Sequence, residues 1–465
     1  MPHDPQTQGA DWPPDFLPAW LVSQRWFGKS HAPEVRSLGS WPVDAAEAGV
    51  RIQTHLLEAE SPLGPVLYQV PIVERSLPLA GGESALIAER GSHFYYDAPH
   101  DPAYASALLR LIGEEGRSLQ GMPKASGTRL APLGQPERYA SRVLGGEQSN
   151  TSIVYEPVDA GTDPAIICKL YRVIHGGENP DIALHRALAA FGSSRVSRPI
   201  GYLTGEWSGS GRPAERITGH LAFAQEFIGD APDAWRVAVQ AASHGEDFSA
   251  RAHELGTAIA EVHGTLAEAM PTTAAQPGSI EAIVSAMSAR SRAAEKEVPQ
   301  LVQFRSAIES GLDAALRVPW PRLQRIHGDF HLGQVLDAPG RGWIVIDFEG
   351  EPLVPLSERG RPDTVMRDIA GMLRSFSYVG GTLADAGRQA DVTGWVARCR
   401  ASFLDGYASV SDLDPREHEV LLAAFELDKA VYEARYEARN RPSWLPIPLA
   451  AIRRLTAPGA GRLRP

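Results

Sequence analysis

The sequence contains little cysteine. Its 465 residues include only Cys168 and Cys399, which lie far apart along the chain. Disulfide frameworks are typical of secreted proteins with several closely spaced cysteines, so we do not expect such a framework here. This scarcity favours a protein of a reducing compartment.

Long apolar runs are also missing. Nowhere do about eighteen apolar residues follow one another, as a membrane-spanning helix requires. The N-terminal stretch MPHDPQTQGADWPPDF is acidic, rich in proline and without an apolar segment, so we do not expect a secretory signal there. From both observations we predict no membrane partner and a cytoplasmic location.

Positive charge is in deficit. The chain has 45 Lys and Arg residues against 56 Asp and Glu residues, a formal net charge of -11. Domains that bind nucleic acid normally carry a basic surface, so nucleic acid is not an expected partner. The remaining composition, 43% hydrophobic and 22% charged residues, is that of a globular protein. A chain of this length exceeds one hydrophobic core, so we expect two or three packed units.

The sequence changes character along its length. Residues 16–30 have helical apolar spacing, and the runs that follow alternate as the strands of a small antiparallel sheet do, so residues 1–92 form a first predicted part. A predicted helix over residues 101–116 and several strand-like runs fill a β-rich part, residues 93–226. Long helical patterns then dominate residues 227–465. The sequence therefore predicts an α+β fold with a β-rich lobe before an α-rich lobe.

The segment 326–352 concentrates polar residues among apolar ones. It holds the run His-Gly-Asp-Phe-His at one end and Ile-Asp-Phe-Glu at the other. Asp347 directly follows a buried-looking strand, and a buried carboxylate needs a partner. Magnesium is a natural partner, because it prefers oxygen ligands and leaves room for substrate phosphates. We therefore predict that Asp347 and the amide oxygen of Gln334 are magnesium ligands.

Asp329, between His327 and His331, then remains to accept a proton from an attacking hydroxyl group. Phosphoryl transfer needs this division, in which one carboxylate orients the nucleophile while metal and cations neutralise the phosphate oxygens. Two alternatives exist. A single Asp is most often an exposed loop residue, and the two histidines fit a zinc site, which would lack a nearby cysteine or third histidine. The whole constellation favours phosphoryl transfer.

A second region has the residues of a phosphate-binding turn. Two glycines and then Ser149, Asn150 and Thr151 stand between strand-like runs, and Lys169 follows within an apolar strand. A lysine in such a strand needs an anion opposite it. Taken singly, the glycines fit an ordinary hairpin and Lys169 fits a side chain that extends to solvent. Their order, turn, strand lysine, helix and acidic loop, indicates a nucleotide site.

These motifs resemble those of the aminoglycoside-phosphotransferase-like sugar kinases, and more closely those of the actinobacterial maltokinases. The resemblance covers nearly the whole chain and is carried by SQRWFGKS, GGEQSNTSIVYE, HGDFHLGQVL, IDFEGEP and RPSWLPIPL. It implies a bilobal fold like that of eukaryotic protein kinases. Residues 1–92 would be the N-terminal cap subdomain, residues 93–226 the nucleotide-binding part of the N-lobe, and residues 227–465 the C-lobe.

The resemblance also implies a reaction, in which ATP and maltose give maltose 1-phosphate, used in α-glucan (glycogen) synthesis. Asp329 would be the catalytic base and Lys169 would contact the phosphates of ATP. The segment 224–230, with Gln225 and Phe227, would be the hinge that binds adenine through its backbone. A trehalose-converting enzyme is a partner by family analogy.

The predicted sugar site draws on the C-terminal helix. Aromatic faces and charged groups bind sugars, and residues four positions apart share a helix face. The predicted substrate residues are His331, Glu433, Tyr436, Arg439 and Trp444. The alternative is that the tyrosines are core residues and the arginines and glutamates form surface ion pairs.

Several alternatives remain open at this point. A kinase-like fold usually pairs its strand lysine with a helix glutamate, but Ala183 stands where that acid is sought, so Glu178, Asp181 or no residue pairs with Lys169. Glucosamine is the main alternative acceptor, for which Glu433 and Glu437 would supply an acidic pocket. A catalytically silent regulatory protein is a third alternative, disfavoured because the predicted base, metal ligands and lysine are all present.

Overall fold

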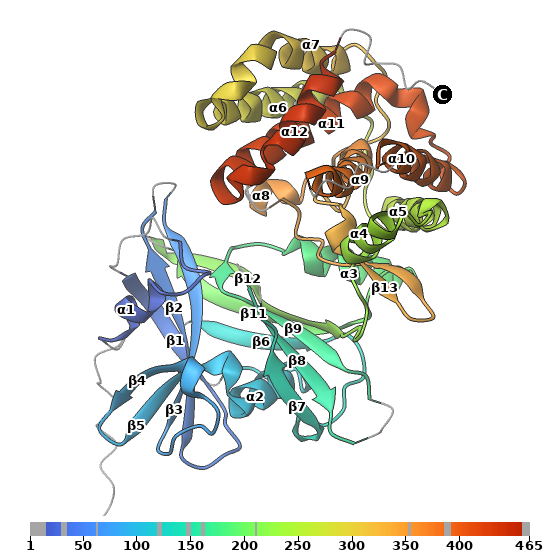
Figure 1. Cartoon of the computed structure of the whole chain (residues 1–465). Helices are drawn as coiled ribbons and strands as arrows, with labels where there is room; N and C mark the ends of the chain where they lie inside the picture. The colour runs from blue at the N-terminus through green and yellow to red at the C-terminus, as the bar shows by residue number, and fades with distance from the viewer. Residues whose placement is uncertain are drawn as a thin grey trace, which may run out of the picture. The chain divides into compact units, whose positions relative to one another are not determined.

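The computed structural model describes residues 15–28, 35–61, 64–118, 123–145, 150–159, 163–209, 212–351, 354, 356–385 and 392–457. The chain divides into two compact units. The first comprises Met1–Ile182 and Arg198–Gly229, and the second comprises Ala183–Ser197 and Asp230–Pro465. Strands dominate the first unit and helices the second (Figure 1). This mixed architecture confirms the predicted fold class.

The first unit begins with an antiparallel sheet in the order β1-β2-β3-β5-β4, with the short strand β10 paired to β3. The predicted boundary at residue 92 falls between β4 and β5, two paired strands of this sheet. The strands are β1 (Val35–Val43), β2 (Val50–Ala59), β3 (Val66–Arg75), β4 (Leu86–Arg90), β5 (His93–Asp97) and β10 (Val173–Ile174).

The helix predicted over residues 16–30 is much shorter in the structure, where α1 covers only Leu17–Leu21. The apolar residues that follow are buried in another way. The rings of Trp26 and Phe27 lie 5.9 and 4.8 Å from the ring of Tyr68 on β3. Packing on the sheet therefore replaces the continuation of the helix.

A second antiparallel sheet of the first unit has the order β6-β11-β12-β9-β8-β7. Its strands are β6 (Lys124–Arg129), β7 (Tyr139–Val143), β8 (Asn150–Pro157), β9 (Ile166–Tyr171), β11 (Pro199–Gly209) and β12 (Arg212–Glu226). Helix α2 (Pro102–Gly113) begins at the cap residue Asp101, whose carboxylate accepts a hydrogen bond from the N–H of Ala103 at 2.9 Å. Its apolar side chains enter the same core as those of β8, β9 and β12.

The second unit is a helical body with one small hairpin. The hairpin is formed by β13 (Val335–Ala338) and β14 (Gly342–Val345). The helices are α3 (Pro180–Ala190), which starts in the first unit, α4 (Ala234–His244), α5 (Ser249–Ala269), α6 (Pro277–Glu297), α7 (Arg305–Ala315), α8 (Leu356–Arg359), α9 (Met366–Asp385), α10 (Val392–Ala408), α11 (Glu419–Asn440) and α12 (Pro446–Leu455).

Helices α5 and α10 of the second unit approach closely at two glycines. A Cβ atom on Gly256 would lie 2.0 Å from the carbonyl oxygen of Phe403, and one on Gly406 would lie 1.9 Å from that of His253. Only glycine permits this contact. The helices of this unit bury one large hydrophobic core. The hairpin β13–β14 and the segment before it contribute Phe330, Val335 and Trp343 to that core.

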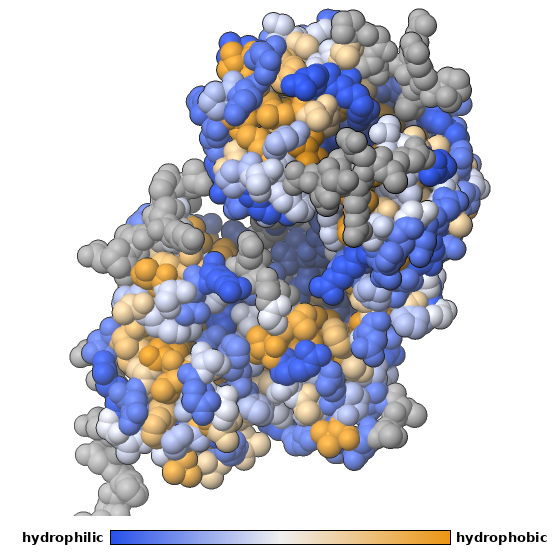
Figure 2. All heavy atoms as spheres, in the orientation of Figure 1, coloured by the Kyte–Doolittle hydropathy of each residue, from blue (hydrophilic) through white to orange (hydrophobic). Residues whose placement is uncertain are grey.

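The surface of each unit is mixed. Figure 2 shows hydrophilic and hydrophobic residues side by side on the drawn face of both units. In the part of the chain that the structure describes, none of the helices has both the length and the apolar character needed to cross a membrane.

Candidate functional site

The loop that carries the predicted base lies in the second unit, just before the hairpin β13–β14. Gly328 has a φ of +86°, in a region that favours glycine. Asp347 has a φ of +66°, and such positive values are uncommon for residues other than glycine. Non-glycine residues held at positive φ, as Asp347 is, are concentrated at functional sites. The two residues stand at the two ends of the segment that the sequence singled out.

Asp368, at the start of α9, fixes this loop. Its carboxylate is fully buried and accepts hydrogen bonds from the backbone N–H groups of His327 and Gly328, each at 2.8 Å. It also lies 3.0 Å from Nε2 of His263, whose other ring nitrogen lies 3.0 Å from the hydroxyl of Tyr407. Asp368 thus joins the start of α9 to the loop that carries the predicted base.

His327 connects the loop to the end of the hairpin. The N–H of Asp329 donates to Nδ1 of His327 at 3.2 Å, so Nδ1 must be an unprotonated acceptor. The proton therefore resides on Nε2, which donates to the carbonyl oxygen of Ile346 at 2.9 Å. This pattern assigns His327 a structural task and fixes its tautomer.

The two predicted magnesium ligands are neighbours. Nε2 of Gln334 donates to Oδ2 of Asp347 at 3.1 Å, and the N–H of Ile346 donates to the carbonyl oxygen of Gln334 at 3.0 Å. Pairing of Val335 with Val345 in the hairpin produces this proximity. A half-turn of the Gln334 amide would bring its oxygen beside the carboxylate, so the pair fits the oxygen ligands that magnesium prefers. The assignment itself stays a prediction.

The carboxylate of Asp329 contacts a residue that the sequence did not indicate. Nζ of Lys429, on α11, donates to Oδ1 of Asp329 at 2.8 Å and to Glu351 at 2.7 Å. Nε2 of His331 lies 4.0 Å from Oδ2 of Asp329. Burial opposes the ionisation of Asp329, but the charges of Lys429 and His331 outweigh burial and lower its pKa to about 2. The carboxylate is thus ionised at neutral pH.

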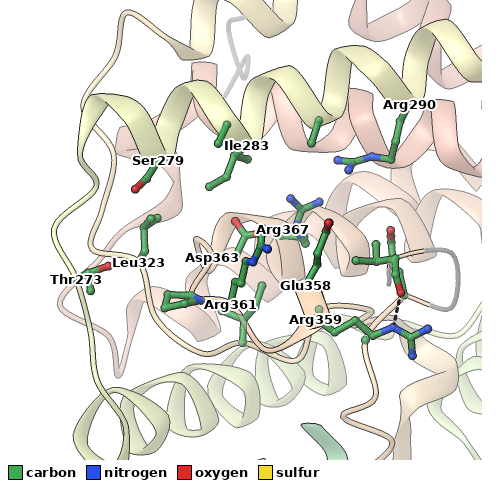
Figure 3. A pocket seen from close by; sticks show the side chains of 18 residues that line it. Thr273, Ser279, Ile283, Arg290, Leu323, Glu358, Arg359, Arg361, Asp363 and Arg367 are labelled. Atoms are coloured by element: carbon green, nitrogen blue, oxygen red, sulfur yellow. Dashed lines mark hydrogen bonds and ion pairs between the residues drawn. The ribbon is translucent and has the colours of Figure 1, made fainter. Parts of the chain in front are cut away.

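A cavity of about 460 Å³ begins beside this loop (Figure 3). Ser279, Ile283 and Arg290 face it from α6, and Arg367 faces it from the opposite side. The loop borders it at Gly328, Gly350 and Glu351, and further lining residues are Thr273, Leu323, Ile326, Val354, Glu358, Arg359, Arg361 and Asp363. Mixed apolar and charged lining of this size is typical of a small-molecule pocket.

Ion pairs order the charged wall of the cavity. Arg290 donates to Asp428 at 2.6 Å, and Arg367 contacts both Asp363, at 2.7 Å, and Asp428, at 3.3 Å. Burial raises the pKa of the Asp428 carboxyl, but the pairings with Arg290 and Arg367 outweigh burial and leave that pKa lowered. The arginines are therefore held in place before a ligand arrives, which reduces the entropy lost on binding.

The predicted sugar residues of the C-terminal helix lie elsewhere in the unit, and none lines this cavity. Glu433 accepts two hydrogen bonds from the buried Arg374, at 2.7 and 3.0 Å. Arg439 pairs with Glu297 on α6 at 2.6 Å. The guanidinium of Arg441 makes cation–π contacts with Tyr436 and Trp444, at 5.6 and 4.3 Å from their ring centres.

The predicted nucleotide residues lie in the first unit, except Ser149, which is outside the described residues. Lys169 on β9 pairs with Asp181 at 3.0 Å, which answers the question that its sequence left open. Asn150 begins β8 opposite Tyr171. The hydroxyl of Thr151 accepts from Nε of the buried Arg172 at 2.8 Å. These contacts place Lys169 and Thr151 on adjacent strands of one sheet.

The predicted hinge follows the same sheet. Gln225 is buried on β12, opposite Ile167 of β9. The N–H of Phe227 donates to the carbonyl oxygen of Ala165 at 2.8 Å. That donor is therefore used within the protein, and adenine would have to be read by other backbone groups of residues 224–230.

Lys429 is the residue that sequence reasoning missed. It stands beside Asp428 in a stretch of α11 that holds the buried apolar residues Leu422, Phe425 and Leu427 and also the buried Glu426. Charges in such a stretch need partners, because burial of an unpaired charge is costly. Two adjacent charges at buried helix positions were the available signal.

Comparison with known proteins gives two family matches. Residues 20–101 match the maltokinase N-terminal cap domain, and residues 179–421 match the phosphotransferase enzyme family. The second match spans more than half of the chain, includes the loop and the hairpin, and ends in the first turn of α11.

Characterised relatives and solved structures agree with these matches. A glucosamine kinase of Streptacidiphilus jiangxiensis is 29% identical over 328 residues, 65% of this chain and 70% of that protein. One of Mycolicibacterium smegmatis is 26% identical over 390 residues, 79% of this chain and 91% of that protein. The structure of a glucosamine kinase with glucosamine, ADP and inorganic phosphate matches 95% of this chain and 97% of its own, with a TM-score of 0.66 and 21% identity. That likeness shows a shared fold.

Proposed function

Because the chain belongs to the phosphotransferase enzyme family, we propose that it transfers the terminal phosphoryl group of ATP to a sugar hydroxyl group. The observation that carries the proposal is the ionised carboxylate of Asp329, held by Lys429 in a loop that borders the 460 Å³ cavity. A kinase needs a carboxylate that orients the acceptor hydroxyl and takes its proton. A sugar in the cavity would bring a hydroxyl to that loop.

The nucleotide and metal follow from the same chemistry. Lys169 would contact the phosphates of ATP, and Gln334 and Asp347 would hold magnesium, which neutralises the charge of the phosphate oxygens. Gln334 and Asp347 already lie in contact at 3.1 Å, so little rearrangement is needed to bring two oxygen ligands together.

Maltose is the acceptor that we propose first, with phosphorylation at its anomeric hydroxyl. The match of residues 20–101 to the maltokinase cap domain supports it. So does the state of the acidic residues on α11, since Glu433 pairs with Arg374 and Glu437 with Arg441. Both glutamates are thus neutralised, which favours an uncharged sugar over an amine. The product, maltose 1-phosphate, would supply α-glucan synthesis, with a trehalose-converting enzyme as partner by family analogy.

Glucosamine is the second candidate. Both characterised relatives compared above are named glucosamine kinases. Within the cavity, the exposed carboxylate of Glu358 points inward and is a suitable partner for an ammonium group (Figure 3). A glucosamine kinase would use the same base and metal ligands with a different acceptor.

Mass spectrometry of reaction products tests both candidates. The purified protein is incubated with ATP, magnesium and, separately, maltose, glucosamine, glucose or an aminoglycoside. An acid-labile maltose phosphate is the expected result, because an anomeric phosphate hydrolyses readily in acid. Phosphorylation of glucosamine alone would overturn the maltose assignment and keep the kinase. The absence of any phosphorylated sugar would overturn the proposed function.

A further inference from the structure

Lys429 lies in the interior of the second unit between two carboxylates. Its side chain is 15% exposed, and its ammonium group donates to Asp329 at 2.8 Å and to Glu351 at 2.7 Å. The ring of Tyr432, one turn further along α11, has its centre 4.7 Å from Nζ. Burial of an ammonium group is costly unless it is paired and hydrogen-bonded, and here two acids from two different loop positions pair with it.

The other charged groups around Asp329 are engaged differently. Arg367 is paired with Asp363 and Asp428, and Arg359 donates to the carbonyl oxygens of Val354 and Glu349. In the loop itself, Nδ1 of His331 accepts from the N–H of Gly333, and the pKa of His331 is lowered, first by burial. His327 and Tyr432 complete the surroundings. Lys429 is therefore the cation whose hydrogen bond to Asp329 the structure shows.

We propose that Lys429 is a positioning residue for the phosphoryl transfer proposed above, and that Glu351 anchors it so that it holds one oxygen of Asp329 and leaves the other for the acceptor hydroxyl. The role rests on the proposed function, because it presupposes that Asp329 acts on a hydroxyl group. It assigns a task to Lys429, which lies outside the sequence motifs of the loop, and to Glu351, a member of the motif IDFEGEP that had no predicted role.

The geometry explains how this arrangement would work. A carboxylate has two equivalent oxygens and a broad terminal torsion, so an unrestrained Asp329 would sample several orientations. The bond to Lys429 fixes Oδ1. Lysine has three N–H donors on a flexible side chain. The second hydrogen bond, to Glu351, restricts the position of Nζ, so that Nζ does not move to pair with another anion. Glu351 also borders the cavity, so the clamp lies where the acceptor would enter.

A purely structural role and a positioning role of Lys429 predict different effects when the lysine is removed. If Lys429 only stabilised the fold, its removal would lower the unfolding temperature and leave the chemistry of each folded molecule unchanged. If it positions Asp329, its removal changes kcat and the pH dependence of kcat. Without the ammonium group, burial would dominate and raise the pKa of Asp329, so the acid limb of the profile would move to higher pH.

The experiment compares K429M, K429R and E351Q with the wild type, using the sugar that the product analysis identifies. We expect K429M to lower kcat by about a hundredfold, as misplacement of a catalytic group does, with little change in the KM for ATP. The acid limb of kcat should move upward in pH. K429R keeps the charge and should recover part of kcat. The kcat of E351Q should lie between those of K429M and K429R. K296M, the same change at an exposed lysine of α6, is the matched control and should behave as wild type.

A second variant protects the test against a failure to fold. The double variant K429M/E351Q removes the cation together with one of its two acids, so a single buried carboxylate is left, and circular dichroism checks that it folds. We expect it also to have a low kcat and a raised acid limb. Wild-type kcat and an unchanged acid limb in folded K429M or in the double variant would overturn the role of Lys429. A wild-type protein that phosphorylates none of the sugars would instead overturn the proposed function.

Discussion

The carboxylate of Asp368 accepts a hydrogen bond from the backbone N–H of Gly328, the residue before the predicted base, at 2.8 Å. This contact joins α9 to the loop without involving the side chains that do chemistry. Asp368 is fully buried, and although burial opposes its ionisation, His263, His327 and the backbone donor of Gly328 keep its pKa below the usual range. The loop is thus fixed by an ionised acid.

We therefore predict that D368N destabilises the protein at neutral pH by about 3 kcal/mol, the typical cost of breaking a buried charged network. Because the folded-state pKa lies below the unfolded value of about 3.9, the stabilisation is present above that pH and is lost as the pH falls through the folded pKa. Chemical denaturation of both proteins between pH 7 and pH 3 measures the difference, which should shrink with acidification. D412N, at an exposed position, is the control, and a difference independent of pH would contradict the explanation.

Much of the fold could be predicted because its signals are local. Alternating apolar residues predicted β2 and β3, and the Asp-Pro start of α2 is a capping signal that the structure confirms. The helix over 16–30 was wrong because Trp26 and Phe27 bury their rings against Tyr68, and no local pattern reports such a distant surface. Tertiary packing overrides periodicity there.

In the candidate site, too, local features could be predicted from the sequence and contacts between distant residues could not. The loop acids Asp329 and Asp347 could be predicted because they lie in a single stretch of sequence, residues 326–352. Lys429 could not be assigned to Asp329, because the two residues are 100 positions apart and only the packing of α11 brings them to 2.8 Å. Charge alone likewise did not separate Arg439, which pairs with Glu297, from an arginine that lines the cavity, such as Arg290.

The role of Asp329 as proton acceptor predicts the outcome of D329N. The amide oxygen of Asn can still accept the hydrogen bond from Lys429, so the fold and ATP binding should remain near wild type. The transfer rate should fall by about 10² to 10⁴-fold, because the amide cannot take the proton. Product formation measures the rate, and calorimetric titration with ATP checks binding. Full turnover by folded D329N would remove Asp329 from the role of base.

The contact between Gln334 and Asp347 predicts a metal effect. In D347A one oxygen ligand is lost, so the affinity for ATP in the presence of magnesium should fall by about tenfold or more, as for loss of a charged contact of about 1.4 kcal/mol or more. Titrations with and without magnesium measure it, and D412A is the control. Equal affinity of D347A and wild type with magnesium present would argue against Asp347 as a ligand.

Two interpretations of Glu433 on the C-terminal helix can be tested: it contacts the sugar, or it forms a structural ion pair with Arg374. If Glu433 contacts the sugar, E433Q should raise the KM for the sugar and leave the unfolding free energy unchanged. The structure favours a loss of stability instead, because Arg374 is 1% exposed and would keep its charge without a carboxylate partner. Removal of one partner of a buried pair costs about 3 to 5 kcal/mol.

The double variant R374M/E433L distinguishes charge from packing in this pair. It replaces both ions by apolar side chains of similar volume, a change that is often neutral or stabilising. We expect it to recover most of the stability that E433Q loses, with the KM for the sugar near the wild-type value. Denaturation curves and sugar saturation kinetics of the same preparations give both quantities. A raised KM in a fully stable double variant would return Glu433 to the sugar site and extend that site from the cavity to α11.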